Sequence, residues 1–294
     1  MNEKIIIAKI LAHKKIDTVI FTACGGSLTD LYNGHFFLQC ESAKIRSYWM
    51  NASEFLNAVP KAFSENTLLI ACSHSGNTAE TVQAALYAQK HGASVVALTF
   101  NAGSKLDLQL PDYTSIVYEW GDGVSSRNKP EGIVLALMNE LLAQNEPGYA
   151  LYEAINNGLD KIDGIVASAC KKIQNSAWLF AQAHHDAPMI YILGSGAAFS
   201  QAYAMAICSL QEMQWMDCCY IHSGEYFHGP FECTDGKTPY ILMKSLGKTR
   251  ALDERAEAFL AKYAGNYEVI DAKKLGLDAI APEAAEYFNC ALFY

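Results

Sequence analysis

The chain has 294 residues, of which 51% are hydrophobic and 18% charged, a composition that fits a well-buried globular enzyme and excludes a disordered protein. This length predicts two domains of ordinary size. The formal net charge of −9 argues against nucleic acid or an anionic membrane surface as a partner, and no apolar run is long enough to span a membrane. Because the start, Met1-Asn2-Glu3-Lys4, also lacks a cleavage signature, we expect a cytoplasmic protein.

The nine cysteines are scattered, and several, such as Cys24, Cys72, Cys170 and Cys208, lie inside apolar runs. No Cys-x-x-Cys pair and no Cys/His ligand spacing occurs, so buried reduced thiols are expected rather than disulfides or a zinc site. We predict no metal and no cofactor.

The first half alternates strands and helices. Strands are predicted at residues 18–23, 45–49, 67–71, 94–99 and 114–120. One helix is predicted to end near residue 40, and two others cover residues 78–91 and 131–144. This alternation predicts an α/β fold with a doubly wound parallel sheet between helices, an αβα sandwich. Ligands of such sheets bind at the carboxyl ends of strands, where Ser27 and the loop 73–78 fall.

The loop Ser73-His74-Ser75-Gly76-Asn77-Thr78 is the most informative stretch. It joins a buried strand to a helix N-terminus, where unpaired N–H groups and the helix dipole favour an anion, and it adds three hydroxyls. It has no lysine, so it is not a nucleotide P-loop and suits a small phosphate monoester held by neutral donors. The simpler interpretation is a polar turn with Thr78 as the helix N-cap.

The second half repeats this alternation of strands and helices after a boundary near Glu146-Pro147-Gly148, which gives domains 1–148 and 149–294. After a helical region over residues 149–183, strand 189–193, the turn Gly194-Ser195-Gly196 and a helix 199–214 follow, with a later strand at 240–243. The matched spacing predicts an internal duplication. Because the counterpart of the serine-rich loop reads Lys244-Ser245-Leu246-Gly247-Lys248-Thr249, we expect one phosphate pocket per chain.

Glu212 is the first catalytic candidate. Ala204 and Cys208 precede it at one-turn steps, which predicts that Glu212 lies on the apolar face of its helix. Desolvation there would raise the pKa of the carboxyl toward the range of a general base. The alternative is that the helix frays near its end and Glu212 is exposed.

His228 is the second candidate, in a segment that Gly224, Gly229 and Pro230 make tight and irregular. A histidine fixed in such a place can act as an acid or a base, although a structural histidine is the commoner outcome. His222 and Glu225 compete for this role.

Taken together, these residues resemble the sugar isomerase (SIS) domain pair of glucosamine-6-phosphate synthase. The resemblance rests on Cys24-Gly25-Gly26-Ser27, on the loop 73–78 and on the sixteen-residue step from Glu212 to His228. Within the family, Met213-Gln214-Trp215 and the run 221–232 are most similar to bacterial deglycases of 6-phosphofructosyl amino acids, the fructose-asparagine type before the fructoselysine type.

The resemblance implies two tandem SIS domains and assigns roles. Glu212 would be the base and His228 the acid, and the sugar phosphate would be held by Gly26, Ser27, Ser73, His74, Ser75 and Thr78. The family also implies a homodimer in which His228 completes the neighbouring chain's site. Family members usually continue past Leu292-Phe293-Tyr294 with a helix and a tail, so the C-terminal lysine of the synthase has no counterpart in this sequence.

The implied reaction is hydrolytic cleavage of a 6-phosphofructosyl amino acid to glucose 6-phosphate and a free amino acid through an enaminol. It needs a positioned acid and base only. An aldose–ketose isomerase acting on bare sugar phosphates needs the same two residues and stays open, as does a non-catalytic regulator that binds a sugar phosphate. The amino acid itself cannot be read from the sequence.

Overall fold

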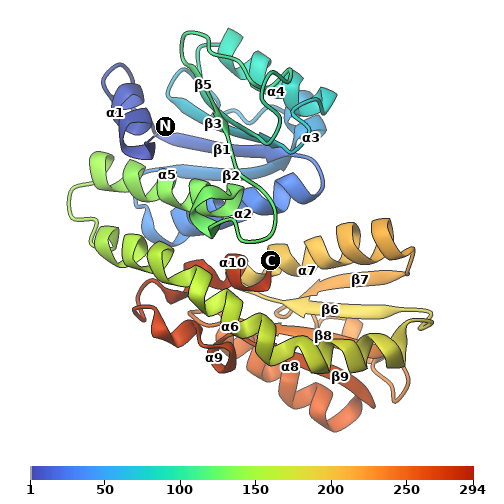
Figure 1. Cartoon of the computed structure of the whole chain (residues 1–294). Helices are drawn as coiled ribbons and strands as arrows, with labels where there is room; N and C mark the ends of the chain where they lie inside the picture. The colour runs from blue at the N-terminus through green and yellow to red at the C-terminus, as the bar shows by residue number, and fades with distance from the viewer. Residues whose placement is uncertain (1) are drawn as a thin grey trace. The chain divides into compact units, whose positions relative to one another are not determined.

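The computed structural model describes residues 2–294. The chain divides into two compact units, Met1–Asn156 and Asn157–Tyr294. Each unit contains one parallel sheet with helices on both of its faces (Figure 1). The division falls within the long helix α6 (Tyr152–His184), a few residues beyond the Glu146-Pro147-Gly148 turn where the sequence places the domain boundary.

The first unit holds a five-stranded parallel sheet in the order β2-β1-β3-β4-β5. Its strands are β1 (Thr18–Ala23), β2 (Arg46–Asn51), β3 (Thr67–Ser73), β4 (Ser94–Thr99) and β5 (Tyr113–Val117). Its helices are α1 (Glu3–Leu11), α2 (Gly26–Glu41), α3 (Ala52–Asn57), α4 (Ala79–Lys90) and α5 (Pro130–Asn145), with a 3₁₀ turn η1 (Ser126–Asn128).

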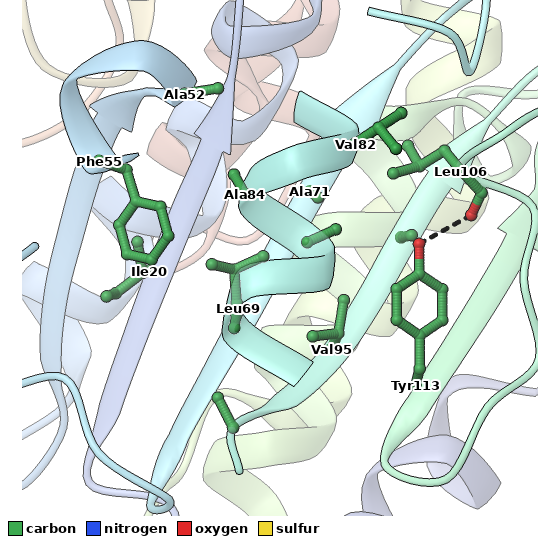
Figure 2. Close-up of a cluster of buried hydrophobic side chains, with 14 residues drawn as sticks. Ile20, Ala52, Phe55, Leu69, Ala71, Val82, Ala84, Val95, Leu106 and Tyr113 are labelled. Atoms are coloured by element: carbon green, nitrogen blue, oxygen red, sulfur yellow. Dashed lines mark hydrogen bonds between the residues drawn. The ribbon is translucent and has the colours of Figure 1, made fainter. Parts of the chain in front are cut away.

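The three central strands of this sheet are buried along their whole length, because helices cover both faces. Helices α3 and α4 pack on one face, where Phe55, Leu69, Val82 and Val95 belong to one apolar cluster (Figure 2). Helices α2 and α5 pack against each other on the other face, where Gly34 of α2 touches β1 and α5. The prediction of a parallel sheet between helices is confirmed.

The strand order creates a switch point between β1 and β3. From β1 the chain moves outward to β2, then returns to the other side of β1 to form β3 and continues to β4 and β5. The connections on the two sides therefore leave from neighbouring strands in opposite directions, and ligands of such sheets bind at the carboxyl ends of these strands. The loop before α2 and the loop before α4 both lie at this edge.

The second unit holds a four-stranded parallel sheet in the order β7-β6-β8-β9, which repeats β2-β1-β3-β4 of the first. Its strands are β6 (Ile190–Gly194), β7 (Cys218–His222), β8 (Pro239–Lys244) and β9 (Asn266–Asp271). Its helical elements after α6 are η2 (Gly196–Ala198), α7 (Phe199–Ala204), the π-helix η3 (Met205–Met213), η4 (Pro230–Cys233), α8 (Arg250–Tyr263), α9 (Ala272–Leu275), η5 (Leu277–Ala279), η6 (Ala285–Phe288) and α10 (Asn289–Phe293).

Different segments cover the two faces of the second sheet (Figure 1). On one face, α7 and η3 pack through Ala202, Ala206 and Leu210 against Ile192 and Ile241. On the other face, α8 and the segment after β7 pack together; this cluster contains Leu193, Tyr226, Phe227, Leu242, Ala256 and Leu260. Each face is therefore closed by its own set of side chains.

The sequence patterns do not predict two strands of the second unit, and one helix differs from its prediction. Strand β7 is only five residues long and follows a segment with no clear turn signal, and β9 carries Asn266, Glu268 and Asp271 on a sheet edge. The helix expected over 199–214 is α-helical only to Ala204 and continues as a π-helix.

None of the helices within residues 2–294 combines the length and the apolar character that a membrane crossing requires.

The packing of α2 against its neighbours yields a stability prediction. A Cβ added at Gly34 would lie 2.4 Å from Val134 Cγ1 and 2.9 Å from Phe21 Cε1, so Gly34→Ala should lower the free energy of unfolding by about 1–3 kcal/mol. Gly164, in α6, has no heavy atom within 4 Å of the added Cβ, so Gly164→Ala should raise it by about 0.4–1 kcal/mol. Urea unfolding of both variants checks this, and a shift in the same direction for both would contradict it.

Candidate functional site

Two loops meet at the carboxyl edge of the first sheet. The loop His74–Thr78 joins β3 to α4, and Cys24 and Gly25 join β1 to α2, which begins at Gly26. The backbone N–H of His74 donates to Ser27 Oγ at 3.2 Å. Residues from two separate βα connections, which the sequence assigns to one ligand, therefore lie in direct contact.

The hydroxyl groups of the loop form a cluster. Ser73 Oγ lies 2.9 Å from Thr78 Oγ1 and 3.5 Å from Ser75 Oγ. Thr78 occupies the N-cap position of α4, but its side chain makes no capping hydrogen bond because the hydroxyl is turned toward Ser73. Thr78 thus stands at the N-cap position, but it does not make the hydrogen bond of an ordinary cap. The first-turn N–H groups of α4 are therefore left to another acceptor.

A neighbouring segment holds this loop in shape. The N–H of Leu106 donates to the Gly76 carbonyl at 3.0 Å, and the N–H of Phe100 donates to the His74 carbonyl at 3.2 Å. Gly76 has φ +65°, and a Cβ there would lie 1.9 Å from Ser104 Oγ and 2.5 Å from Thr99 Oγ1. Glycine is therefore required at this position, both for its backbone conformation and for the close approach.

An aromatic group that the sequence patterns did not single out surrounds His74. The imidazole stacks on Phe100 with ring centroids 5.0 Å apart and planes 6° apart, and Trp120 meets it edge-on at 5.0 Å. His74 Nδ1 lies 2.9 Å from the Tyr118 hydroxyl. Phe100 directly follows β4 and Tyr118 directly follows β5, so aromatic residues at strand ends were the signal that could have found them.

The ionisable groups around the loop are held neutral. Burial raises the pKa of Asp30, and the nearby Glu131 carboxyl raises it further. Burial raises the pKa of the Cys72 thiol, which lies within hydrogen-bonding reach of Ser27 and Tyr118, and burial lowers the pKa of His74. An anion at this loop would therefore meet uncharged donors and the N-terminal end of α4.

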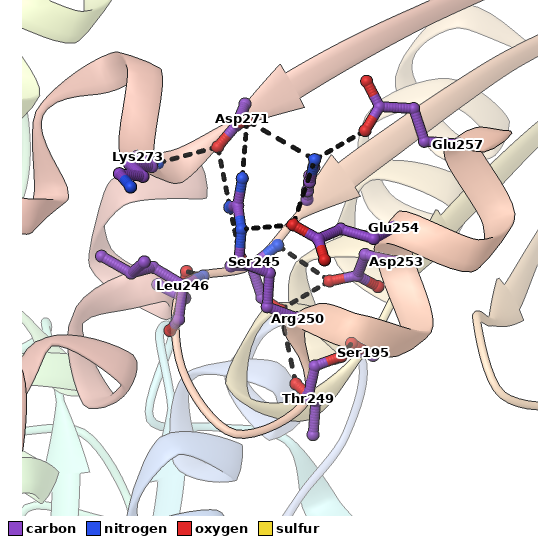
Figure 3. Close-up of polar contacts among 12 residues, drawn as sticks. Ser195, Ser245, Leu246, Thr249, Arg250, Asp253, Glu254, Glu257, Asp271 and Lys273 are labelled. Atoms are coloured by element: carbon purple, nitrogen blue, oxygen red, sulfur yellow. Dashed lines mark hydrogen bonds and ion pairs between the residues drawn. The ribbon is translucent and has the colours of Figure 1, made fainter. Parts of the chain in front are cut away.

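The corresponding loop of the second unit is occupied by the chain's own side chains (Figure 3). The buried carboxylate of Asp253 accepts from Ser245 N at 2.8 Å and from Ser245 Oγ at 2.5 Å. Leu246 N donates to Asn289 Oδ1 at 2.9 Å, and Lys248 N donates to Glu286 Oε2 at 3.2 Å. In the second unit, side chains of the chain itself accept hydrogen bonds from the N–H groups that would otherwise face a ligand. This difference between the two loops supports the prediction of a single phosphate pocket per chain.

Glu212 is exposed, so its expected place on an apolar face is wrong. It lies in the π-helix η3, whose hydrogen bonds run from residue i to i+5. Residues in such a helix turn by a smaller angle per step, so the four-residue spacing from Ala204 and Cys208 no longer keeps them on one face. The alternative interpretation, an exposed Glu212, agrees with the structure.

His228 is also exposed, in the irregular segment between β7 and η4. Its neighbour Phe227 packs on the α8 face of the second sheet, whereas η3, which carries Glu212, packs on the α7 face. The elements that carry the predicted base and the predicted acid therefore pack on opposite faces of the second sheet. His222 ends β7 and accepts from Gly224 N at 3.1 Å, a structural role, and Glu225 is exposed.

No disulfide joins the cysteines within residues 2–294, and Cys170, expected within an apolar run, is exposed. Within residues 2–294, no group of three His, Cys, Asp or Glu side chains is arranged to hold a metal ion.

Comparison with known proteins places this geometry in a family. The SIS domain model matches residues 10–114, which include both loops of the first unit. Fructosamine deglycase FrlB of Bacillus subtilis is 39% identical over 94% of this chain and 84% of its own length. Fructoselysine 6-phosphate deglycase of Escherichia coli is 23% identical over 90% of this chain and 76% of its own length.

Solved structures agree. A protein from Salmonella typhimurium, described as a candidate phosphosugar isomerase, superposes with a TM-score of 0.95 at 39% identity and covers 99% of this chain, which covers 87% of that one. Identity at this level along nearly the full length is specific to a family rather than to a fold. The chain therefore belongs to the SIS-domain family of fructosamine deglycases.

Proposed function

We propose that this chain is a deglycase that cleaves 6-phosphofructosyl amino acids to glucose 6-phosphate and a free amino acid. The observation that carries the proposal is the hydroxyl cluster at the switch point of the first sheet, in a chain 39% identical to a fructosamine deglycase. The cluster supports a phosphorylated ligand, and the relative supports the bond that is cleaved.

The phosphate would bind to Ser73, Ser75 and Thr78, with Gly26, Ser27 and His74 beside them. A phosphate dianion gains from the N-terminal end of α4 and from hydroxyl donors without a lysine. Because the chain carries a net charge of −9, long-range repulsion opposes the binding of a phosphate dianion, and this local geometry supplies the affinity.

The reaction needs three proton transfers and one hydrolysis. In the open-chain ketosamine, the Glu212 carboxylate removes a proton from C1 while His228 donates one to the C2 oxygen, which gives an enaminol. Return of a proton to C2 shifts the double bond to C1 and nitrogen. Water then adds to this imine and releases the amino acid and the aldehyde of glucose 6-phosphate, so no oxidant or reductant is consumed.

The placement of Glu212 and His228 supports a homodimer with shared sites. The elements that carry them pack on opposite faces of the second sheet, which favours a site whose two residues come from different chains. We propose that each site takes its base from one protomer and its acid from the other, as a two-fold dimer allows.

The second unit, in this proposal, is itself an SIS domain that has lost phosphate binding. Its four strands repeat the order of the first unit, and Asp253, Asn289 and Glu286 take up the N–H groups of its loop. It would contribute catalytic residues instead of a phosphate pocket.

The bracing of the phosphate loop gives one prediction. Gly76→Ala forces a Cβ onto Ser104 and should raise the Kd for glucose 6-phosphate at least about tenfold, because the hydroxyls lose their arrangement. Gly103→Ala is the matched control, since Gly103 also has a positive φ but open space around the added Cβ. Calorimetric titration of both variants measures the effect, and equal affinities would contradict the role of the loop.

The assignment of the base gives a second prediction. Glu212→Gln should lower kcat roughly 10²- to 10⁴-fold with KM little changed, because proton removal from C1 is lost and binding is not. Mass spectrometry of products from a panel of 6-phosphofructosyl amino acids gives the rates, with the exposed Glu225→Gln as control. Full turnover by Glu212→Gln would refute the assignment, and interconversion of bare sugar phosphates without amino acid release would indicate an isomerase instead.

The shared site gives a third prediction. Glu212→Gln and His228→Asn chains should each be inactive alone, whereas co-expression should restore about a quarter of wild-type activity per chain, because half of the dimers are mixed and each has one intact site. Activity of the purified mixture tests this. No recovery in mixed dimers confirmed by mass spectrometry would place both residues in the same chain's site.

A further inference from the structure

The hydrogen bond between His74 and Tyr118 has a direction that chemistry can decide. Nδ1 of the imidazole and the phenol oxygen are 2.9 Å apart, and either could carry the shared proton. A neutral imidazole has a single N–H group. The direction of this bond therefore fixes what the other ring nitrogen, Nε2, offers on the side away from the phenol.

The surroundings keep both partners neutral. Burial lowers the pKa of His74, and burial raises the pKa of Tyr118, with Cys72, Asp30 and Glu131 adding to the rise. The phenol thus keeps its proton and is available as a donor. Phe100 and Trp120 fix the plane of the imidazole from two sides, and within that plane the bond to Tyr118 distinguishes the two ring nitrogens.

We propose that Tyr118 is a positioning residue for phosphate recognition: its hydroxyl donates to Nδ1 of His74 and so holds the ring proton on Nε2, where it can be donated to the sugar phosphate. A phosphate dianion accepts hydrogen bonds and donates none, so the opposite direction would present a lone pair to it. The inference rests on the proposed function, since it assumes that the loop of Ser73 and Thr78 takes a phosphate.

The test combines affinity and spectroscopy on the full chain. Tyr118→Phe should raise the Kd for glucose 6-phosphate roughly 3- to 10-fold, because the imidazole loses the bond that selects its tautomer. Tyr149→Phe is the matched control: Tyr149 also donates its hydroxyl, to Asn139 Oδ1 at 2.5 Å, in a contact that involves no residue of the loop, and its loss should leave this Kd unchanged. In ¹⁵N spectra of histidine-labelled protein, the His74 signal, assigned by its absence in His74→Gln, should show one tautomer with the proton on Nε2 in the wild type and a mixture in Tyr118→Phe.

A double-mutant cycle separates positioning from a general structural effect. Glutamine at position 74 offers an N–H donor without tautomers, so adding Tyr118→Phe to His74→Gln should change the Kd by less than about twofold. A wild-type proton on Nδ1, or wild-type affinity in Tyr118→Phe, would overturn the positioning role alone. Failure of the wild type to bind glucose 6-phosphate would overturn the proposed function, and this role with it.

Discussion

The hydrogen bond between Ser73 and Thr78 decides how the first unit can meet an anion. Threonine at a helix N-cap ordinarily binds the first-turn N–H groups of its own helix, which closes that end to ligands. Here the Thr78 hydroxyl is turned to Ser73, and Gly76 allows the loop to fold tightly against Thr99 and Ser104. The end of α4 and a group of hydroxyls are thus directed to the same place, at the edge where the strand order opens a crevice.

The two units show how one topology can be kept open or closed by a few side chains. Their strand orders match over four strands, and each has a serine at the carboxyl end of the third strand along the chain: Ser73 ends β3, and Ser245 directly follows β8. In the second unit the Asp253 carboxylate, which is fully buried, accepts from both the N–H and the hydroxyl of Ser245. A carboxylate at that position satisfies the donors that a phosphate would need, so the repeated fold is stabilised by its own anion.

The sequence predicts what depends on local pattern and misses what depends on tertiary contact. The buried strands of the first sheet and the glycine-bearing loop between β3 and α4 follow from apolar runs and turn chemistry, and they were placed within a few residues. The π-helix was missed because its i to i+5 bonds leave no mark on an apolar pattern read at α-helical spacing, and Glu212 was therefore assigned to the wrong face. Tyr118 was missed because its importance arises only from its contact with His74, 44 positions away.

The separation of Glu212 and His228 by one sheet links the fold to assembly. Helices on both faces are the condition for a parallel sheet to be buried, so residues on η3 and on the segment after β7 cannot approach each other through it. An acid and a base that must flank one substrate, if carried by these two segments, then require two chains. If the first unit binds the phosphate, as proposed, proton transfer falls to residues of other elements, and the neutral loop has only to hold the ligand in position while they act.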